Sequence, residues 1–474
     1  MTFEAEAHAA AGEVPRIAWR LVTLPVVLCA GILIASFLKS DLTHNDFERF
    51  DDLRVTCVFF VLIGAACIAY AALWRERPAL SGVTVTIGAL IGGGFLLASF
   101  PVGSKDAFLY AFVGKLWNTY HTNPYTTPPS AFVADPWQPF AQVVWAQQPT
   151  PYGPLFLWQA RLLDGLAAGR LFVAVWAHKV VALAALAGSI VIAGRLMNAT
   201  ANERWYRIAL LAWNPLLLFE SAGNGHNDAV MLLLLLDAAW LHLRGGLGRR
   251  VLTPAALALA IWYKWYAVLF VPVFMLDVVR DAGWSSLRRW GTVLIVSVVV
   301  SGAVLLAPLA EALPLLAHRL AGHENLRQIF PLQLSPVLAA LLWGLEVTGQ
   351  TGGRWPLMWF DIVRVGTFAF AALVLLICQW RSAIDLIGAL CGISAAFTLL
   401  IITILWPWHL EVPVALALVA AAPAWRTLGV LLTLMGLLSY FFTFVWATAL
   451  LVVLAVALWI VHRLTSRKNP APQG

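Results

Sequence analysis

The sequence predicts an all-α protein that crosses a membrane many times. Hydrophobic residues make up 61% of its 474 residues and charged residues only 12%, about half the charged share of an average soluble domain. Apolar stretches of about 20 residues, the length that crosses the hydrocarbon core as a helix, recur at Ile17 to Leu38, Val55 to Trp74, Gly82 to Phe100 and onward to Ile460. Because a helix satisfies its own backbone hydrogen bonds in lipid, helices are the expected element throughout.

The positive charge of the chain collects in short loops, which predicts how the chain is threaded. The net charge is +7, and the positive-inside rule explains it better than nucleic-acid binding does, so no nucleic-acid partner is expected. Placing the basic loops in the cytoplasm gives one consistent topology of about 12 crossings with both termini inside. These loops hold Arg75 and Arg77, Arg195 to Arg207, Arg244 to Arg250, Arg280 to Arg289, Arg381, Arg426, and Arg463 to Lys468.

The chain shows no internal repeat and no separate soluble domain. Residues 1–464 are therefore predicted to form one transmembrane domain in the cell (inner or plasma) membrane, and residues 465–474 a short cytoplasmic tail. The opening residues carry no small-residue cleavage pattern, so the first span is expected to be retained. The five cysteines lie inside apolar stretches without CxxC spacing, which indicates neither a disulfide frame nor a zinc site. The residues predict no cofactor and no metal site.

The stretch from Thr253 to Val279 must enter and leave on the cytoplasmic side in this topology. Its two arms are short for a crossing, and Lys264 interrupts them. We therefore expect a broken or re-entrant hairpin, an element that is tolerated only where it is buried or lines a cavity.

In the same topology, four segments that are rich in polar residues lie on the outer side of the membrane. They are Lys39 to Arg54, Pro101 to Gly153, Glu311 to Phe330, and Trp406 to Glu411. The second, Pro101 to Gly153, is too long for an ordinary connection between spans and is rich in aromatic residues, proline and glycine. We expect it to have structure of its own.

Two short helices are predicted within this long loop. Asp106 to Asn118 has helical spacing and places Phe108, Phe112, Leu116 and Trp117 roughly on one face, so this helix is expected to lie in the interface plane. The second helix is predicted at Pro136 to Gln147. The next stretch, Leu155 to Leu166, is short for a crossing and is assigned to the outer side.

Asp106 is the first candidate for chemistry, because it follows an apolar span by only a few residues. A carboxylate at the lip of the membrane is partly desolvated, which raises its basicity and suits it to take a proton from a hydroxyl group. The alternative is a structural role as a helix cap, since an Asp at a helix start satisfies free backbone N–H groups. Spacing alone favours the cap, and both roles are compatible.

The second candidate is the run Gly223-Asn224-Gly225-His226-Asn227-Asp228 between apolar stretches. Polar groups at membrane depth are expensive and usually mark a pathway or a site. The alternative is a turn between two helices with Asn227 or Asp228 as the cap, which the glycines favour. His226 and Asp228 could also bind a metal ion, but two ligands without a third are a weak signal.

Lys264 stands among four aromatic residues in Trp262-Tyr263-Lys264-Trp265-Tyr266. A buried ammonium needs a partner, and an anionic phosphate head group would serve. A lysine that snorkels from an aromatic belt is an equally good interpretation.

Two outer segments add further cations and aromatic rings. They are the corner from Trp406 to Glu411, with Trp408 and His409, and the loop from His318 to Arg327. Such residues could bind sugar faces or a phosphate. Interfacial tryptophans commonly anchor helix ends, so anchoring is the simpler role for Trp406 and Trp408.

Taken in order, these segments resemble the polyprenol-phosphate-mannose-dependent α-1,6-mannosyltransferases of bacteria, within the membrane glycosyltransferases called GT-C. The resemblance covers Pro101 to Glu411 and rests on several short motifs in the right order. They are Ser104-Lys105-Asp106 with Tyr110 and Gly114, Asn123-Pro124-Tyr125, Pro151-Tyr152-Gly153-Pro154, Trp213-Asn214-Pro215, His226-Asn227-Asp228, Lys264 with Pro272, and Trp406 to His409. The chain departs from the pattern at His409, where a tyrosine is expected, and at Lys105, where arginine is commoner.

The resemblance implies a GT-C fold, a polyprenyl-phosphate sugar donor and an active site on the outer side of the membrane. It implies transfer of a hexose, expected to be mannose, to an extracytoplasmic glycan or glycolipid. Asp106 would be the general base of an inverting reaction, and Lys264, Arg327 and His226 would bind the donor phosphate. The acceptor or sugar would be held by Tyr110, Tyr125, Tyr152, Asn227, Asp228, Trp408 and His409.

A transporter or flippase for envelope glycan precursors is the rival prediction, because broken helices and charges inside the membrane are transporter signals too. A transporter would place its polar groups near the midplane of related halves, whereas here they gather around one long loop and no repeat is visible. A noncatalytic partner in envelope synthesis is a third possibility, and it predicts binding without turnover.

Overall fold

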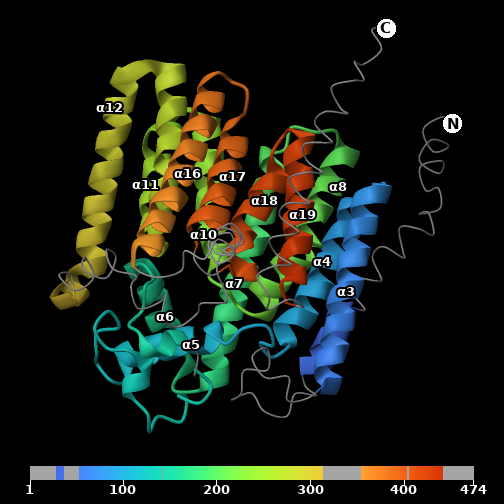
Figure 1. The fold of residues 1–474 in the computed structure, drawn as a ribbon, viewed down its shortest axis with the longest axis vertical. Helices are drawn as coiled ribbons and strands as arrows, with labels where there is room; N and C mark the ends of the chain where they lie inside the picture. Colours follow the sequence, from blue (N-terminus) through green and yellow to red (C-terminus); the bar gives the residue numbers. More distant parts are fainter. Residues whose placement is uncertain (1–27, 37–52, 142–143, 313–353, 403–404, 441–474) are drawn as a thin grey trace, which may run out of the picture.

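The computed structural model describes residues 28–36, 53–141, 144–312, 354–402 and 405–440, and this part of the chain consists of helices and their connections, without a strand. Figure 1 shows the helices packed side by side as a bundle, with a lobe built around α5 and α6 at one end. The α-helices are α3 (Leu53–Glu76), α4 (Gly82–Ala98), α5 (Asp106–Asn118), α6 (Pro154–Ala167), α7 (Leu171–Leu196), α8 (Ala201–Ala212), α9 (Pro215–Leu218), α10 (Asp228–Arg244), α11 (Thr253–Tyr263), α12 (Val271–Leu306), α16 (Arg354–Trp380), α17 (Leu386–Ala396), α18 (Glu411–Val419) and α19 (Pro423–Leu438).

Apolar helices dominate the bundle, as expected of a membrane protein. Among the described residues, three helical stretches are long and apolar enough to cross a membrane: Cys57–Glu76, Leu171–Leu196 and Trp265–Glu311. Five shorter apolar helices accompany them: Gly82–Ala98, Val365–Trp380, Leu386–Ile401, Pro407–Val419 and Pro423–Leu438. The all-helical prediction is thus confirmed for the described part of the chain, while the number of crossings stays a prediction.

The broken hairpin predicted at Thr253 to Val279 is present. Helix α11 ends at Tyr263, Lys264 has extended backbone angles (φ −139°, ψ 118°), and a 3-10 helix over Trp265–Phe270 leads into α12. Helix α12 is itself interrupted at Gly283, whose φ of +76° and ψ of 175° are not helical and favour glycine. Figure 1 shows the chain reversing there, so the long apolar stretch from Trp265 consists of two legs.

The two ends of the bundle differ in what they carry (Figure 1). We call the end with α5, α6 and residues 119–153 the α5 face, and the end where α12 reverses the bend face. Side chains of the basic loops tie neighbouring helices together at the connections that follow α7, α10 and α18. Arg207 donates to the carbonyls of Val419 and Ala420, and Arg249 pairs with Asp281 at 3.0 Å.

The predicted helix at Asp106 to Asn118 is confirmed with those bounds, and it is α5. Its environment differs from the expectation of one apolar face in the interface plane, because every residue from Asp106 to Leu116 is buried in protein. Phe108, Phe112 and Leu116 pack against Trp137 and the start of α7. The helix is therefore enclosed by the loop that follows it and by α6 and α7.

The second helix, predicted at Pro136 to Gln147, is wrong. Residues 136–141 form consecutive turns, and only Val144–Gln147 forms a short 3-10 helix. Asp135 accepts a hydrogen bond from the backbone N–H of Trp137 at 2.7 Å, and Pro139 cannot donate the backbone bond that a continuing helix requires. In this segment the turn-forming Asp and Pro residues thus determine the backbone conformation, and the helical spacing of the apolar residues does not.

Candidate active site

The α5 face carries a buried carboxylate at the start of α5. Asp106 is the first residue of that helix and only 5% exposed, and its backbone N–H donates to Ser104 Oγ at 3.1 Å. The N-cap position belongs to Lys105, whose side chain makes no capping hydrogen bond. The Asp106 carboxylate instead faces side chains: His226 Nε2 lies 3.7 Å and the Tyr110 hydroxyl 3.5 Å from its Oδ2. The capping role is therefore not the one that the carboxylate adopts.

The run from Gly223 to Asp228 forms a tight turn that leads into α10. Gly225 has a φ of +76°, and a Cβ added there would lie 2.9 Å from Lys179 Cγ, so a larger residue would be strained and crowded. Asn224 Oδ1 accepts from the Gly103 backbone N–H at 3.0 Å, which joins the turn to the loop before Asp106. The turn predicted from the glycines is confirmed, and it also carries the polar side chains of the site.

His226 lies between two carboxylates. Its Nδ1 is 3.0 Å from Glu220 Oε2 and its Nε2 is 3.7 Å from Asp106 Oδ2, with the imidazole fully buried. Trp408 stacks on the ring at a centroid distance of 4.2 Å and an angle of 17°, and Trp406 stacks on Trp408 in turn. The corner after residue 405 thus covers the histidine, in addition to any anchoring role.

The break at Lys264 turns its side chain toward the first residue of α10. Lys264 Nζ lies 2.6 Å from Asp228 Oδ1, with the two side chains only 11% and 4% exposed. The ammonium also lies 5.7 Å from the centre of the Tyr152 ring. The lysine is therefore held by a protein carboxylate, a partner that neither sequence interpretation included.

The Pro151-Tyr152-Gly153-Pro154 motif fits against this break. Gly153 donates its backbone N–H to the Tyr263 carbonyl at 3.2 Å, and a Cβ at Gly153 would lie 2.0 Å from the Trp262 carbonyl oxygen. Only glycine allows so close an approach. As a result Tyr152 stands beside Tyr110, with their hydroxyl groups 3.4 Å apart.

Four carboxyl groups are buried in this site: Asp106, Glu220, Asp228 and Glu411 are each no more than 5% exposed. His226 pairs with Asp106 and Glu220, and Lys264 pairs with Asp228. Burial raises the pKa of Asp106, and the nearby charges of His226 and Lys264 offset part of that effect. A buried carboxyl with a raised pKa and specific charged neighbours is typical of a functional site.

Burial also raises the pKa of the Tyr110 and Tyr152 hydroxyl groups, and the charge of Asp106 adds to the effect for both. Both phenols therefore stay protonated in the physiological range and can donate hydrogen bonds to Asp106 or to a bound hydroxyl group.

Most of the predicted site residues come together here. Asp106, Tyr110, Tyr152, His226, Asp228, Lys264 and Trp408 are linked by the contacts given above. Asn227 is 3% exposed, and neither atom of its amide has a hydrogen-bond partner among the described residues. A buried amide without a partner is costly, which suits a group that binds a ligand.

Three predicted site residues do not line the site directly or cannot be placed in it. Tyr125 donates to the Tyr152 carbonyl at 2.9 Å, so it supports the site from behind. His409 Nδ1 accepts from the Trp406 backbone N–H at 3.2 Å within the covering corner. Arg327 lies outside the described residues, as does most of the Glu311 to Phe330 loop.

Three buried charged residues of the site, Glu220, Lys179 and Glu411, did not figure among the predicted site residues. Glu220 lies in the π-helix Phe219–Gly223, and Lys179 lies in α7 with its side chain fully enclosed. Lys179 Nζ donates to the Leu96, Leu97 and Ser99 carbonyls at the end of α4, so it fixes the segment that leads to Asp106. A signal was present in the sequence, because each is a charged residue within an apolar stretch.

No group of three or more His, Cys, Asp or Glu side chains is arranged to hold a metal ion in the part of the chain that the structure describes. The side chains of the site can take part in proton transfer, and Lys264, Tyr110 and Tyr152 can stabilise negative charge.

Comparison with known proteins gives one family. Residues 21–280 match the family described as alpha-(1->6)-mannopyranosyltransferase, N-terminal domain. A Mycolicibacterium smegmatis protein named probable alpha-(1->6)-mannopyranosyltransferase is 27% identical over 61% of this chain and 57% of its own length. The alpha-(1->6)-mannopyranosyltransferase of Mycobacterium tuberculosis is 30% identical over 32% of this chain and 26% of its own length.

A third relative, alpha-(1->6)-mannopyranosyltransferase A of Corynebacterium glutamicum, is 27% identical over 41% of this chain and 39% of its own length. The aligned parts thus span 57%, 26% and 39% of the length of these three relatives. The family match itself covers residues 21–280 of 474, which is more than half of the chain. This protein therefore belongs to the alpha-(1->6)-mannopyranosyltransferase family.

Proposed function

We propose that this chain transfers a mannosyl residue from a polyprenyl-phosphate donor to an extracytoplasmic glycan or glycolipid, with inversion at the anomeric carbon. The observation that carries the proposal is the buried Asp106 carboxylate, which has a raised pKa and lies within the region matched by the family. Asp106 is the general base that accepts the proton of the acceptor hydroxyl as the new glycosidic bond forms.

The donor phosphate departs beside Lys264 in this mechanism. Asp228 occupies one side of the ammonium, and two of its three N–H donors remain for an anionic oxygen. Arg327 and His226 are the further candidates for phosphate contacts. A positive group at this position stabilises the charge that develops on the leaving phosphate.

An open apolar groove beside Lys264 suits the lipid part of such a donor. It is lined by Trp262, by Val298, Gly302 and Leu306 of the second leg of α12, and by Ala310 of the 3-10 helix that follows. Trp262 packs against Gly302, and an isoprenoid chain could lie along the open side of the groove. Trp262 precedes Lys264 by two residues in the chain. A donor that arrives through the membrane requires no nucleotide-binding domain.

The acceptor sugar is held by the aromatic and amide groups around Asp106. Tyr110 and Tyr152 offer hydroxyl donors, and the amide of Asn227 is free to bind a sugar hydroxyl. Asp228, Tyr125, Trp408 and His409 complete the proposed acceptor site. We place the α5 face on the extracytoplasmic side, because the Arg-rich loops gather toward the other end.

The direct test is transfer from synthetic polyprenyl-phosphate-mannose to a mannoside acceptor by the purified protein, with Asp106→Asn alongside. We expect product from the natural chain and a loss of about 10²- to 10⁴-fold in kcat for the variant, since that is the usual contribution of a positioned general base. Thermal unfolding of both proteins serves as the control for folding. Full activity of Asp106→Asn would overturn the assignment of the base, and counterflow of intact donor without product would favour a transporter.

A further inference from the structure

A second carboxylate lies behind His226, on the side away from Asp106. Glu220 Oε2 is 3.0 Å from Nδ1 and Asp106 Oδ2 is 3.7 Å from Nε2, so the three side chains form a row of carboxylate, imidazole and carboxylate. Glu220 and His226 are both fully buried. Close contacts of this kind commonly shorten and straighten only when substrate is bound.

Glu220 is itself fixed by two other donors. Its Oε2 accepts from Asn224 Nδ2 at 3.0 Å, and its Oε1 accepts from the Tyr440 hydroxyl at 2.6 Å. Asn224 also binds the Gly103 backbone, three residues before Asp106. The carboxylate is therefore fixed 3.0 Å from Nδ1 of the imidazole, and Trp408, stacked on the ring, keeps Nε2 toward Asp106. Neither imidazole nitrogen is aligned for a hydrogen bond with a described residue in this structure, so the contacts have to straighten when substrate binds.

We propose that His226 receives from Asp106 the proton that Asp106 removes from the acceptor, and that Glu220 is the positioning residue for this transfer. The inference rests on the proposed function. The acceptor O–H bond breaks as the bond from acceptor oxygen to the anomeric carbon forms, and the bond from that carbon to the phosphate oxygen breaks. The proton moves first to the Asp106 carboxylate and then to Nε2 of His226, which becomes an imidazolium between two carboxylates.

This transfer returns Asp106 to its ionised form, and the imidazolium gives the proton to the departing phosphate or to water before the next turnover. A buried carboxyl with a raised pKa keeps its proton, and a protonated Asp106 cannot accept another. In its neutral form the imidazole donates Nδ1–H toward Glu220 and leaves Nε2 free as an acceptor. The same division of roles, with a carboxylate that fixes the tautomer of a proton-accepting histidine, operates in hydrolytic triads.

Every charged group that faces the two residues has to be considered. Asp106 faces Tyr110 on its own helix, His226 and Asp228 from the start of α10, Lys264 from the end of α11, and Tyr152 from the loop. Glu220 faces His226, Asn224 and Tyr440, and Glu411 lies close enough to interact with it. Lys264 is engaged by Asp228, which leaves His226 as the nearest proton acceptor for Asp106 in the described part of the site.

The kinetic test uses isosteres of the imidazole. His226→Asn retains an amide near the Nδ1 position, and His226→Gln retains one near the Nε2 position. Glu220→Gln keeps the shape of the side chain but removes the charge and replaces one of its two acceptor oxygens with a donor. We expect kcat to fall about 10²-fold in both histidine variants and about 10-fold in Glu220→Gln, with the KM for the donor nearly unchanged. The matched control is His242→Gln, which breaks a histidine–carboxylate pair at the bend face, where Nε2 lies 2.9 Å from Asp277 Oδ2, and should leave kcat unchanged.

The second test does not depend on turnover. Infrared difference spectra of the natural chain against Asp106→Asn identify the carbonyl band of the protonated Asp106 carboxyl, and its midpoint is followed with pH. In the relay the first proton taken up by the pair resides on His226, and the charge of that imidazolium lowers the pKa of Asp106. His226→Gln removes this charge and should move the midpoint to higher pH, and His242→Gln should not move it.

The outcomes separate this inference from the proposed function. An unchanged kcat in His226→Gln would overturn the relay, and so would a rise in the KM for the donor alone, which would place His226 on the phosphate. If the natural chain transfers no mannose, the proposed function fails. The infrared midpoint of Asp106 then tests by itself whether His226 and Asp106 interact. An unmoved Asp106 midpoint in His226→Gln would then overturn the inference.

Discussion

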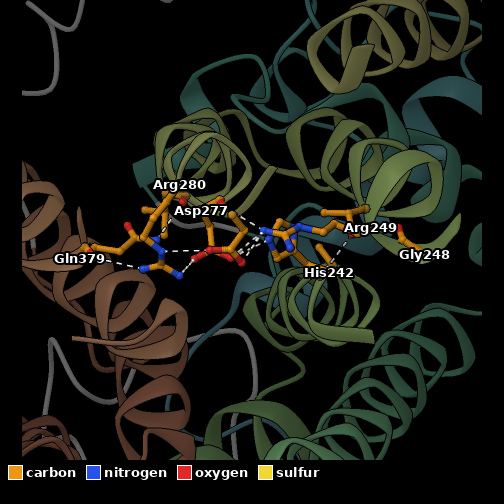
Figure 2. Close-up of polar contacts among 10 residues, drawn as sticks. His242, Gly248, Arg249, Asp277, Arg280 and Gln379 are labelled. Carbon is orange, nitrogen blue, oxygen red and sulfur yellow. Dashed lines mark hydrogen bonds and ion pairs between the residues drawn. The ribbon is translucent and has the colours of Figure 1, made fainter. Parts of the chain in front are cut away.

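At the bend face, Asp277 is surrounded by basic side chains, whereas in the site at the α5 face Asp106 and Glu220 both lie against His226, and Asp228 lies against Lys264. Figure 2 shows the first cluster, in which His242, Arg249 and Arg280 all converge on Asp277. Arg280 also donates to the Gln379 carbonyl at 3.1 Å, which ties α12 to α16. The second cluster holds Asp106 and Lys264, and the two clusters occupy opposite ends of α10, about 20 Å apart at 1.5 Å per residue.

The difference between the clusters indicates different tasks. At the bend face each carboxylate has at least two cationic partners, since Asp281 also pairs with Arg249 and Arg280. Such fully paired charges hold helices together, and they leave no unpaired charge that a ligand could bind. In the site at the α5 face His226 lies between two carboxylates, and the Asn227 amide has no partner among the described residues, so protons or ligand hydroxyl groups can be bound with a gain in free energy.

The largest expected effect tests the bend face. Asp277→Ala removes the common partner of three basic groups: His242 loses its carboxylate in a buried position, and Arg249 and Arg280 keep only the Asp281 carboxylate among the described residues. We expect the free energy of unfolding to fall by about 3–5 kcal/mol, while kcat per folded molecule stays the same. Thermal unfolding in detergent and transfer assays on the folded fraction measure the two quantities. A lowered kcat at unchanged stability would contradict the division of tasks.

The second largest effect is expected from breaking the Lys264–Asp228 ion pair at the α5 face. Lys264→Met should lower kcat about 10²-fold, because it removes the proposed partner of the leaving phosphate and leaves Asp228 buried and unpaired. The double variant Lys264→Met with Asp228→Asn removes the unpaired charge and should recover the stability lost in the single variant. If the double variant also recovered kcat, Lys264 would be a structural partner only.

A smaller loss of activity is expected when Lys179, which connects α7 to the end of α4 next to the site, is replaced. Lys179→Met should lower kcat about 10-fold, since the three carbonyls at the end of α4 lose their donor and the loop before Asp106 loosens. Stability should change little, because the loss of hydrogen bonds is offset by removal of a buried charge. Lys179→Gln, which keeps a donor, should retain more activity. Equal loss in both variants would point to a general packing defect.

The smallest expected effect is a shift along the pH axis. Because the pKa of Asp106 is raised above its ordinary value of 3.8, activity should fall on the acid side at a higher pH than an unperturbed aspartate would give. The direction follows from the mechanism, since the base must be ionised to accept a proton. A profile of kcat/KM against pH measures the midpoint. His226→Gln should move this midpoint further upward, whereas His242→Gln at the bend face should leave it in place.

Local features of the site were predictable from the sequence. The start of α5 at Asp106 follows from helical spacing, the turn at Gly225 from its glycines, and the break at Lys264 from a charge within a short apolar arm. Each depends on residues that are close together along the chain. The helix predicted at Pro136 to Gln147 is wrong for the same kind of reason, because turn and proline chemistry next to Asp135 overrides the spacing.

The sequence by itself determined that this protein is helical and belongs in a membrane, because composition and the length of apolar stretches decide how a chain is solvated. Only the tertiary structure decided that Lys264 pairs with Asp228, and that His226 stands between Asp106 and Glu220. These contacts join segments that are far apart along the chain. They depend on the rotation and depth of each helix, and packing sets both, because the hydrophobic pattern of nearly uniformly apolar helices contains little information about which side faces inward.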